Sequence, residues 1–409
     1  MTWVVALGGL VLLVFLHELG HFWVARAVGM RPRSFYVGFP PALVKVRWNG
    51  IEYGIGMIPL GGLVRIPGMH RPAARDLRAM TEPAVREQPS LAPVVGAVRR
   101  ALDAENYDLA RQAYPELERE LGAASLSAGA RRSAARGLRD VEEGTAPEAY
   151  WRAPTWKRVA VIAAGPLANV AIAFLILFYV FAVAGGPSQR PTSTVANVKA
   201  GAPAAAAGLE VGDRVVAVNG QAIGTFSDAS RLIRSSRGGP VTLTVLRGGQ
   251  RVTVGPRPTV RENGRWIFGF SPAAKLVTYP PVKAARISVS DLWGVVTGTA
   301  TGIKGLFSSQ GRSQLSGPPG IVRVEHTELQ VGLPYYLEIL AFVSMSLALL
   351  NLLPLLPLDG GHILFSLIEA VRRRALAREV YERVSVVGFA LILLLLVIAS
   401  SNDLSGGAH

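Results

Sequence analysis

Residues 3–28 read WVVALGGLVLLVFLHELGHFWVARAV, and this stretch decides the fold. Apart from a short polar island at His17, Glu18 and His21, and Arg26 near its end, the stretch is apolar. It is long enough for a membrane-spanning helix, which needs about 20 residues. Ionisable side chains at membrane depth are costly and usually functional. The stretch therefore predicts a membrane helix that carries a reactive site.

The five residues His17-Glu18-Leu19-Gly20-His21 have the spacing of a metal site. Positions i and i+4 of a helix lie on the same face, so His17 and His21 can bind one metal ion. Glu18 can then act as the general base on a water molecule at the metal. The alternative is a chance group of polar residues, and the cost of placing such a group in a membrane argues against it.

Two imidazoles leave a catalytic zinc ion one protein ligand short, because such sites use three protein ligands and water. The chain has no cysteine, so the third ligand must be His, Asp or Glu. Asp359 fits, since it follows the apolar run NLLPLLPL at 351–358 and few other acids lie in the apolar segments. The alternative for Asp359 is an Asp-Gly turn that ends a helix. A His/His/Asp set suits one Zn²⁺ per chain.

Composition excludes most soluble enzymes. Of the 409 residues, 50% are hydrophobic and 17% are charged, and the mean hydropathy is +0.33. A soluble domain has about 25% charged residues. The net charge of +15 beside long apolar runs indicates contact with the anionic lipid of a bilayer, and we expect no nucleic-acid partner.

Hydropathy predicts a polytopic α-helical membrane protein with about four transmembrane helices, at residues 1–30, 158–185, 335–371 and 384–401. Basic residues cluster after the first span, before the second, and between the third and fourth. By the positive-inside rule these clusters face the cytoplasm. We therefore expect both termini outside the cytoplasm, in a multi-pass protein of the bacterial inner membrane.

Four further regions complete the expected organisation. A membrane-associated β region covers 35–66, with a hairpin signal at Asn49-Gly50. A charge-mixed cytoplasmic helical insertion covers 70–155, and its simplest interpretation is a solvated spacer rather than a regulatory module. Residues 187–271 form an extracytoplasmic α+β domain, and 285–310 an amphipathic interfacial helix interrupted by charges.

The segment 187–271 resembles a PDZ domain of the bacterial membrane-protease type. It contains Ala-Pro-Ala-Ala before Gly-Leu and then Gly212-Asp213, and Ser227 is expected to cap a helix that ends near Ser236. PDZ domains bind an extended peptide at a sheet edge, so this domain could take a peptide C-terminus. The alternative is that it only limits access to the membrane site.

Together the motifs resemble the site-2 protease family of intramembrane zinc metalloproteases, in the bacterial PDZ-bearing branch that includes the regulator of sigma-E protease. The resemblance rests on His-Glu-Leu-Gly-His in the first span, Leu-Asp-Gly-Gly at 358–361 and the PDZ-like segment between them. It is supported by 58–62 (IPLGG), 164–169 (AGPLAN) and 316–321 (SGPPGI), and it covers nearly the whole chain.

The resemblance implies zinc ligation by His17, His21 and Asp359 and acid/base catalysis by Glu18. It also implies that Asn351 and Pro354 hold the unwound part of a substrate. The implied substrates are single-pass membrane proteins already trimmed by another protease, such as anti-sigma factors or signal-peptide remnants. A substrate helix must unwind before hydrolysis, and either the Asn49-Gly50 hairpin or the strand after Gly62, which includes Leu63 and Val64, could pair with it.

Three other functions fit the sequence less well. A soluble metalloprotease would not bury His-Glu-x-x-His in a membrane helix. A metal transporter usually has repeated halves, and none are visible in this sequence. A non-catalytic PDZ membrane scaffold is the main alternative, but it has no need of Glu18 together with Asp359.

Overall fold

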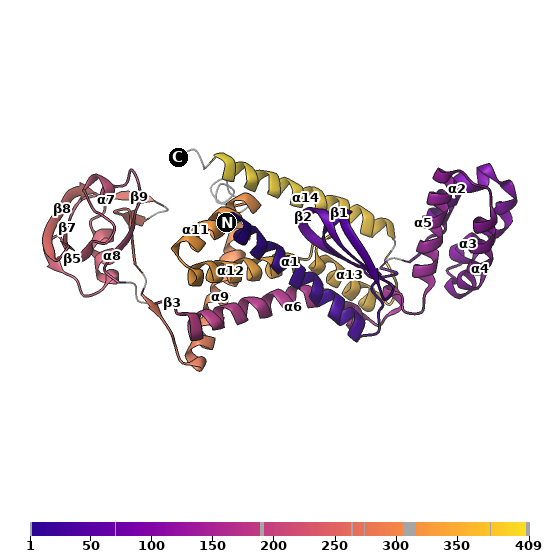
Figure 1. Ribbon diagram of the computed structural model, residues 1–409, viewed down its shortest axis with the longest axis horizontal. Coiled ribbons are helices and arrows are strands. Elements are labelled where there is room, and N and C mark those ends of the chain that lie inside the picture. Colours follow the sequence, from indigo (N-terminus) through magenta and orange to yellow (C-terminus); the bar gives the residue numbers. More distant parts are fainter. Residues whose placement is uncertain are drawn as a thin grey trace. The chain divides into compact units, whose positions relative to one another are not determined.

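The computed structural model describes residues 2–69, 71–188, 192–262, 265–273, 275–305, 316–376 and 378–405. The chain divides into two compact units. The first comprises Met1–Leu175, Asp291–Gln330 and Ile339–His409, and the second comprises Ile176–Ser290 and Val331–Glu338. Figure 1 labels the elements, from α1 in indigo to α14 in yellow.

Within the described residues, four helices are long and apolar enough to cross a membrane, as the sequence predicts. They are α1 (Thr2–Ala27), α6 (Thr155–Tyr179), α12 (Leu333–Asn351) and α14 (Arg378–Ser405). A π-helical turn at Val180–Ala184 extends α6. These helices and several small sheets have the architecture of a membrane protein.

The third apolar segment, expected over 335–371, contains two helices. Helix α12 ends at Asn351 and α13 covers Asp359–Arg372. Pro354 and Pro357 lie between them, and proline lacks the N–H that a continuing helix needs. A Cβ atom on Gly360 would lie 2.2 Å from the carbonyl oxygen of Leu352. The connecting loop therefore packs directly on the first turn of α13, where Asp359 lies.

The first unit contains a sheet of two long, bent strands, β1 (Ser34–Trp48) and β2 (Ile51–Arg65). Asn49-Gly50 joins them in a turn with positive φ at both residues, as the sequence predicts. Because both strands bend, residues 34–37 pair with 52–55 on one side and with 62–65 on the other. The segment 62–65 is therefore an edge of this sheet, and no other strand of the described residues pairs with it.

The segment expected as a helical insertion folds into four α-helices: α2 (Ala74–Glu87), α3 (Ala92–Asp103), α4 (Tyr107–Ala123) and α5 (Ala128–Thr145), with 3-10 turns at Pro89–Leu91 and Tyr150–Arg152. Their apolar faces enclose a core that includes Leu77, Leu91, Val98, Leu117 and Val141. The two ends of the segment meet, since Tyr150 N–H donates to Pro67 O and Trp151 N–H donates to Gly68 O.

The second unit contains an antiparallel sheet of order β6-β5-β7-β8, formed by β5 (Arg214–Val218), β6 (Gln221–Ala222), β7 (Pro240–Arg247) and β8 (Gln250–Pro258). Smaller pairs join β3 (Gly186–Pro187) to β12 (Leu276–Val277), β4 (Val195–Val198) to β11 (Phe270–Pro272), and β9 (Val260–Glu262) to β10 (Arg265–Ile267). The helices are α7 (Pro203–Ala206) and α8 (Phe226–Ser235).

The expected N-cap of α8 is wrong by two residues. Thr225 is the N-cap, and its hydroxyl accepts a hydrogen bond from Asp228 N–H while the Asp228 carboxylate bonds back to Thr225 N–H. This reciprocal pair satisfies two helix N–H groups, whereas Ser227 could satisfy only one.

Two more helices follow the second sheet. Helix α9 covers Pro281–Gly305, and α11 covers Pro318–Val331. The end of the interfacial helix expected at 285–310 lies outside the described residues. Helix α11 is fixed to the end of α14, because the Asp403 carboxylate accepts hydrogen bonds from the N–H groups of Gly317 and Gly320, at 2.8 and 2.9 Å.

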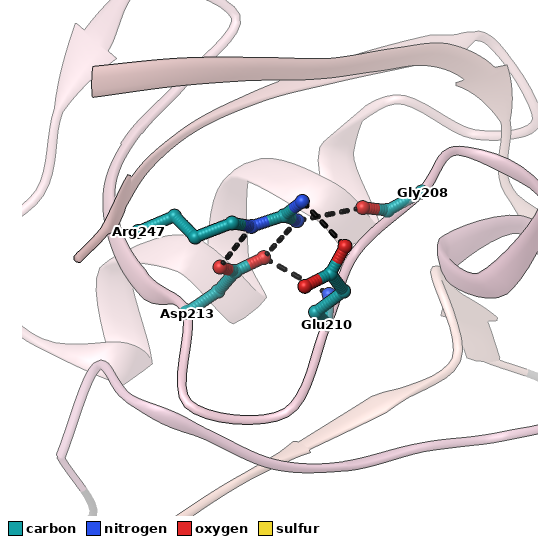
Figure 2. Close-up of polar contacts among 4 residues, drawn as sticks. All are labelled: Gly208, Glu210, Asp213 and Arg247. Carbon is teal, nitrogen blue, oxygen red and sulfur yellow. Dashed lines mark hydrogen bonds and ion pairs between the residues drawn. The ribbon is translucent and has the colours of Figure 1, made fainter. Parts of the chain in front are cut away.

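Figure 2 shows a bidentate ion pair in the second unit between Arg247 of β7 and Asp213. The Arg247 Nε and Nη2 atoms lie 2.8 and 2.7 Å from the two Asp213 oxygens, and the guanidinium also donates to Glu210 and to the carbonyl of Gly208. The Asp213 side chain is buried. The pairing with Arg247 lowers the pKa of the Asp213 carboxyl below its ordinary value.

Arg247→Met should loosen the second unit, because it leaves the buried Asp213 carboxylate without its cation. We expect hydrogen exchange of β5 and β7 in the full chain to become at least tenfold faster. In the parent, protection should be complete at neutral pH and lost as the pH falls below about 3.9, towards the lowered pKa of Asp213. Arg251→Met, on an exposed arginine of β8, is the matched control; equal exchange in both variants would contradict the prediction.

Candidate metal centre

Two buried imidazoles of α1 lie side by side. His17 and His21 are 6% and 7% exposed, and their Nε2 atoms are 3.3 Å apart. Both point to the same side because they are one helical turn apart. The Nδ1 atom of each ring lies on the other side of the ring and contacts α6.

Asp359 brings a carboxylate to this pair from the first turn of α13. Its Oδ2 atom lies 3.2 Å from His17 Nε2 and 3.4 Å from His21 Nε2. This oxygen is buried and has no hydrogen-bond partner among the described residues. A buried carboxylate oxygen without a hydrogen bond is costly unless another group binds it.

The three atoms form a nearly equilateral triangle with sides of 3.2 to 3.4 Å. A tetrahedral zinc ion bound at about 2.0–2.1 Å requires its ligand atoms to lie about 3.3 Å apart. The triangle therefore has the size that zinc needs, and the unsatisfied oxygen of Asp359 fits a ligand. The residues suit the metal in both chemistry and spacing.

Groups behind the imidazoles fix their orientation. His21 Nδ1 lies 2.8 Å from the carbonyl oxygen of Val161, which requires a proton on Nδ1 and leaves Nε2 for a metal. The side-chain amide of Asn169, which is fully buried on α6, lies 3.3 Å from His17 Nδ1. The Ser344 hydroxyl donates to the carbonyl of Asn169, so α12 supports this position in turn.

A glycine of α6 provides the room for both imidazoles. A Cβ atom on Gly165 would lie 2.2 Å from His21 Nε2 and 2.8 Å from His17 Nε2. Helices α1 and α6 also touch at Gly20, where a Cβ atom would lie 2.5 Å from the carbonyl oxygen of Ala164. Small residues permit such close approach of helices in a membrane.

Glu18 lies under the edge of the sheet. A Cβ atom on Gly62 would lie 2.3 Å from Glu18 Cγ, and the backbone of Val64 is hydrogen-bonded to the Glu18 carboxylate. Strand β2 therefore covers the acidic side chain that neighbours both imidazoles.

Comparison with known proteins decides the family. The family model of peptidase family M50 matches residues 5–395. The zinc metalloprotease RasP of Geobacillus kaustophilus is 30% identical over 407 residues, which cover 96% of this chain and 95% of that protein. The regulator of sigma-W protease RasP of Bacillus subtilis is 28% identical over 412 residues, which cover 96% and 95%.

The chain belongs to peptidase family M50. This confirms the resemblance to the site-2 protease family and identifies the chain as a zinc metalloprotease with Zn²⁺ as its cofactor. A catalytic function is thereby favoured over the non-catalytic scaffold.

The other residues expected to contact substrate lie at different distances from this M50 centre. Gly62 and Val64 contact Glu18, whereas the Leu63 side chain is 36% exposed. Asn351 is the last residue of α12 and Pro354 is an exposed residue of the following loop. In the described structure, no hydrogen bond or ion pair joins either of these two to His17, His21 or Asp359.

Sequence reasoning missed the positions of Asn169 and Gly165 in this M50 peptidase. Both lie in the AGPLAN motif of α6, which was read only as a family marker. The usable signal was Asn169 itself, since a polar amide in a span without charge needs a partner. Which partner it has depends on tertiary packing, because Asn169 and His17 are 152 residues apart in sequence.

Proposed function

We propose that this M50 peptidase hydrolyses a peptide bond within or next to the transmembrane segment of single-pass membrane proteins. The substrates would already be trimmed by another protease, and anti-sigma factors and signal-peptide remnants are the expected classes. A relative named as a regulator of sigma-W protease supports the first class. The observation that carries the proposal is the position of His17, Glu18 and His21 on α1, a helix suited to a membrane.

In this proposal His17, His21 and Asp359 hold the zinc ion and Glu18 transfers protons. Zinc, when bound, supplies Lewis acidity toward the scissile carbonyl and toward water. The Glu18 carboxylate accepts the proton of the attacking water and returns it to the leaving amine. The carbonyl of Val161 holds His21 in the orientation that leaves its Nε2 for the metal. Asn169 does the same for His17 when its amide is turned so that Oδ1, which has no hydrogen-bond partner among the described residues, accepts the proton of His17 Nδ1.

A substrate helix must unwind first, because its carbonyl groups are engaged in i→i+4 hydrogen bonds. The edge segment 62–65 offers replacement bonds. The carbonyl of Arg65 faces β1, where it accepts a hydrogen bond from Arg33 N–H. Successive residues of a strand point their backbone groups in opposite directions, so Gly62 and Val64 face the free edge. An extended substrate paired there would lie beside Glu18.

Val64→Pro tests the pairing. It removes the Val64 N–H, which points away from β1 and bonds to the Glu18 carboxylate, and leaves the bonds of Leu63 and Arg65 to β1 intact. We expect KM for a single-span substrate to rise about tenfold, the effect of one or two lost hydrogen bonds, while zinc content is unchanged. Val64→Ala keeps the N–H and is the control. A fall in kcat at constant KM would mean that the strand only positions Glu18.

The second unit is interpreted as a PDZ-like domain with a peptide groove. A cavity of about 470 Å³ lies along α8 and the segment 265–271. It is lined by basic residues and by apolar ones, among them Lys199, Arg234, Arg265, Phe226 and Ile233. The basic residues suit the carboxylate of a peptide C-terminus, and the apolar residues suit its side chains. The lining therefore favours a peptide-binding role for this domain over a role that only excludes large substrates. Deleting 187–271 should weaken the affinity for trimmed substrate; a filter would instead release cleavage of untrimmed substrate.

The proposed location is the bacterial inner membrane. Both termini and the PDZ-like domain would lie outside the cytoplasm, and the insertion 70–155 would lie inside it. The support is the placement of the arginine clusters between the apolar helices.

The direct test is cleavage of a single-span substrate by the purified protein in detergent. We expect one cut, mapped by mass spectrometry, inside the apolar segment or within a few residues of it. 1,10-Phenanthroline should abolish the cut, and stoichiometric Zn²⁺ should restore it. Cleavage only of soluble loops far from the segment would contradict the proposal.

A further inference from the structure

The first unit has a cavity of about 810 Å³ whose lining includes none of the residues His17, Glu18, His21 and Asp359. Its walls come from the two ends and the α3–α4 connection of the helical insertion, from the start of α6, from α13 and from the start of α14. Six arginines line it: Arg71, Arg75, Arg158, Arg372, Arg373 and Arg374. The proposed proteolytic function makes no use of this cavity.

Half of these arginines are already paired. Arg158 lies 2.7 Å from Glu369, Arg75 lies 2.5 Å from Glu379, and Arg71 lies 3.7 Å from Glu105. The consecutive residues 372–374 are exposed and have no ion-pair partner among the described residues. The remaining lining carboxylate, Asp103, balances at most one of these three charges. The cavity therefore has an excess of positive charge.

Two of the arginines have fixed positions. The Arg71 guanidinium lies over the Trp151 ring, 4.8 Å from its centroid, and 6.0 Å from the centroid of Tyr107. Arg158 is 8% exposed, and its buried Nε–H has no hydrogen-bond partner among the described residues. A buried charged donor that lacks an acceptor is costly, so a cavity with such a donor on its wall suits an anion.

The cavity opens where the apolar helices begin. Arg372 is the last residue of α13, and the membrane-compatible part of α14 starts at Glu379. A ligand in the cavity would thus lie at the level of lipid headgroups. Guanidinium groups match the geometry of phosphate oxygens, and basic pockets at this level bind anionic headgroups.

We propose that this cavity binds a phosphate group, supplied by the headgroup of an anionic phospholipid in the leaflet on the arginine-rich side of the membrane. Arg372, Arg373 and Arg374 provide the charge, and Arg71 and the insertion close the cavity from the other side. The insertion is then a part of a lipid site rather than a solvated spacer.

The experiment uses the full-length protein in detergent and measures binding of a fluorescent phosphatidylglycerol, with phosphatidylcholine as the reference lipid. The test variant is Arg372→Gln/Arg373→Gln/Arg374→Gln. The matched control, Arg132→Gln/Arg136→Gln/Arg139→Gln, removes the same charge from exposed positions of α5 that do not line the cavity. Zinc content reports whether each variant is folded, and Arg71→Gln is a second, milder variant.

We expect affinity for phosphatidylglycerol to fall about a hundredfold in the 372–374 variant, at about fivefold per arginine, and to change less than twofold in the α5 control. Arg71→Gln should lower the affinity severalfold. Inorganic phosphate at millimolar concentration should not displace the lipid; displacement would assign the cavity to a soluble phosphate compound and overturn the lipid assignment. Equal losses in the two triple variants, or no preference for phosphatidylglycerol, would overturn the site.

Discussion

Replacing Glu18 by glutamine should reduce hydrolysis of a single-span substrate by about 10²–10⁴-fold, the usual contribution of a general acid/base. Glutamine has nearly the same shape as glutamate, but its amide cannot accept the proton of the attacking water. The three residues proposed to hold zinc are unchanged, so one zinc ion per chain should stay bound. Metal analysis and single-turnover cleavage on the same preparation check both halves of the prediction.

The control for Glu18→Gln is Glu116→Gln, at an exposed position of α4. It removes the same charge far along the chain from the metal centre and should leave both readouts unchanged. Undiminished cleavage by Glu18→Gln would show that another group moves the proton. Loss of zinc in that variant would place Glu18 in the metal site instead.

Replacing Gly165 by alanine should cost at least ten- to a hundredfold in zinc affinity, the loss typical of disturbing groups around a metal site. The new methyl carbon would stand 2.2 Å from His21 Nε2 and 2.8 Å from His17 Nε2, so the imidazoles must shift from their present positions. The three-atom triangle would then no longer fit a tetrahedral ion. Competition for zinc with a fluorescent chelator measures the change, and activity should be recovered in part at high zinc concentration.

Gly8→Ala is the matched control for Gly165→Ala. Gly8 lies on α1, in the same kind of apolar helix, and a Cβ atom there has no neighbour within 4 Å. The zinc affinity of the Gly8→Ala variant should equal that of the parent protein. If Gly165→Ala also binds zinc normally, the space at Gly165 serves only the packing of α1 against α6.

Hydropathy predicted the four membrane helices because apolar length is a property of one continuous segment. The grouping of His17 and His21 followed from helical periodicity in the same way. Asp359 was identified by a different argument, from the scarcity of acids in apolar segments, and the structure places it 3.2 Å from His17. Apolar length, helical spacing and the number of acidic residues in the apolar segments can all be read from the sequence alone.

Other features depend on contacts that no local pattern records. The third apolar segment looked continuous, yet Pro354 and Pro357 divide it and place Asp359 at a helix start. Residues 34–37 pair with 52–55 on one side and with 62–65 on the other only because β1 and β2 bend, and this pairing makes 62–65 an edge of the sheet. Gly165 and Asn169 act on side chains of another helix. Ser227 was expected to cap α8, and the cap is Thr225 because its side chain and that of Asp228 bond reciprocally to each other's backbone N–H groups.

The metal centre joins residues that are synthesised at very different times. Asp359 follows His21 by more than three hundred residues, so α1 leaves the ribosome long before α13 exists. A growing chain at that stage has both imidazoles and Glu18 but lacks the third side chain of the triangle. With the proposed ligands, the zinc site is complete only after translation has passed α13 and that helix has docked. In this assignment, newly made membrane proteins around an unfinished chain do not meet a complete zinc site.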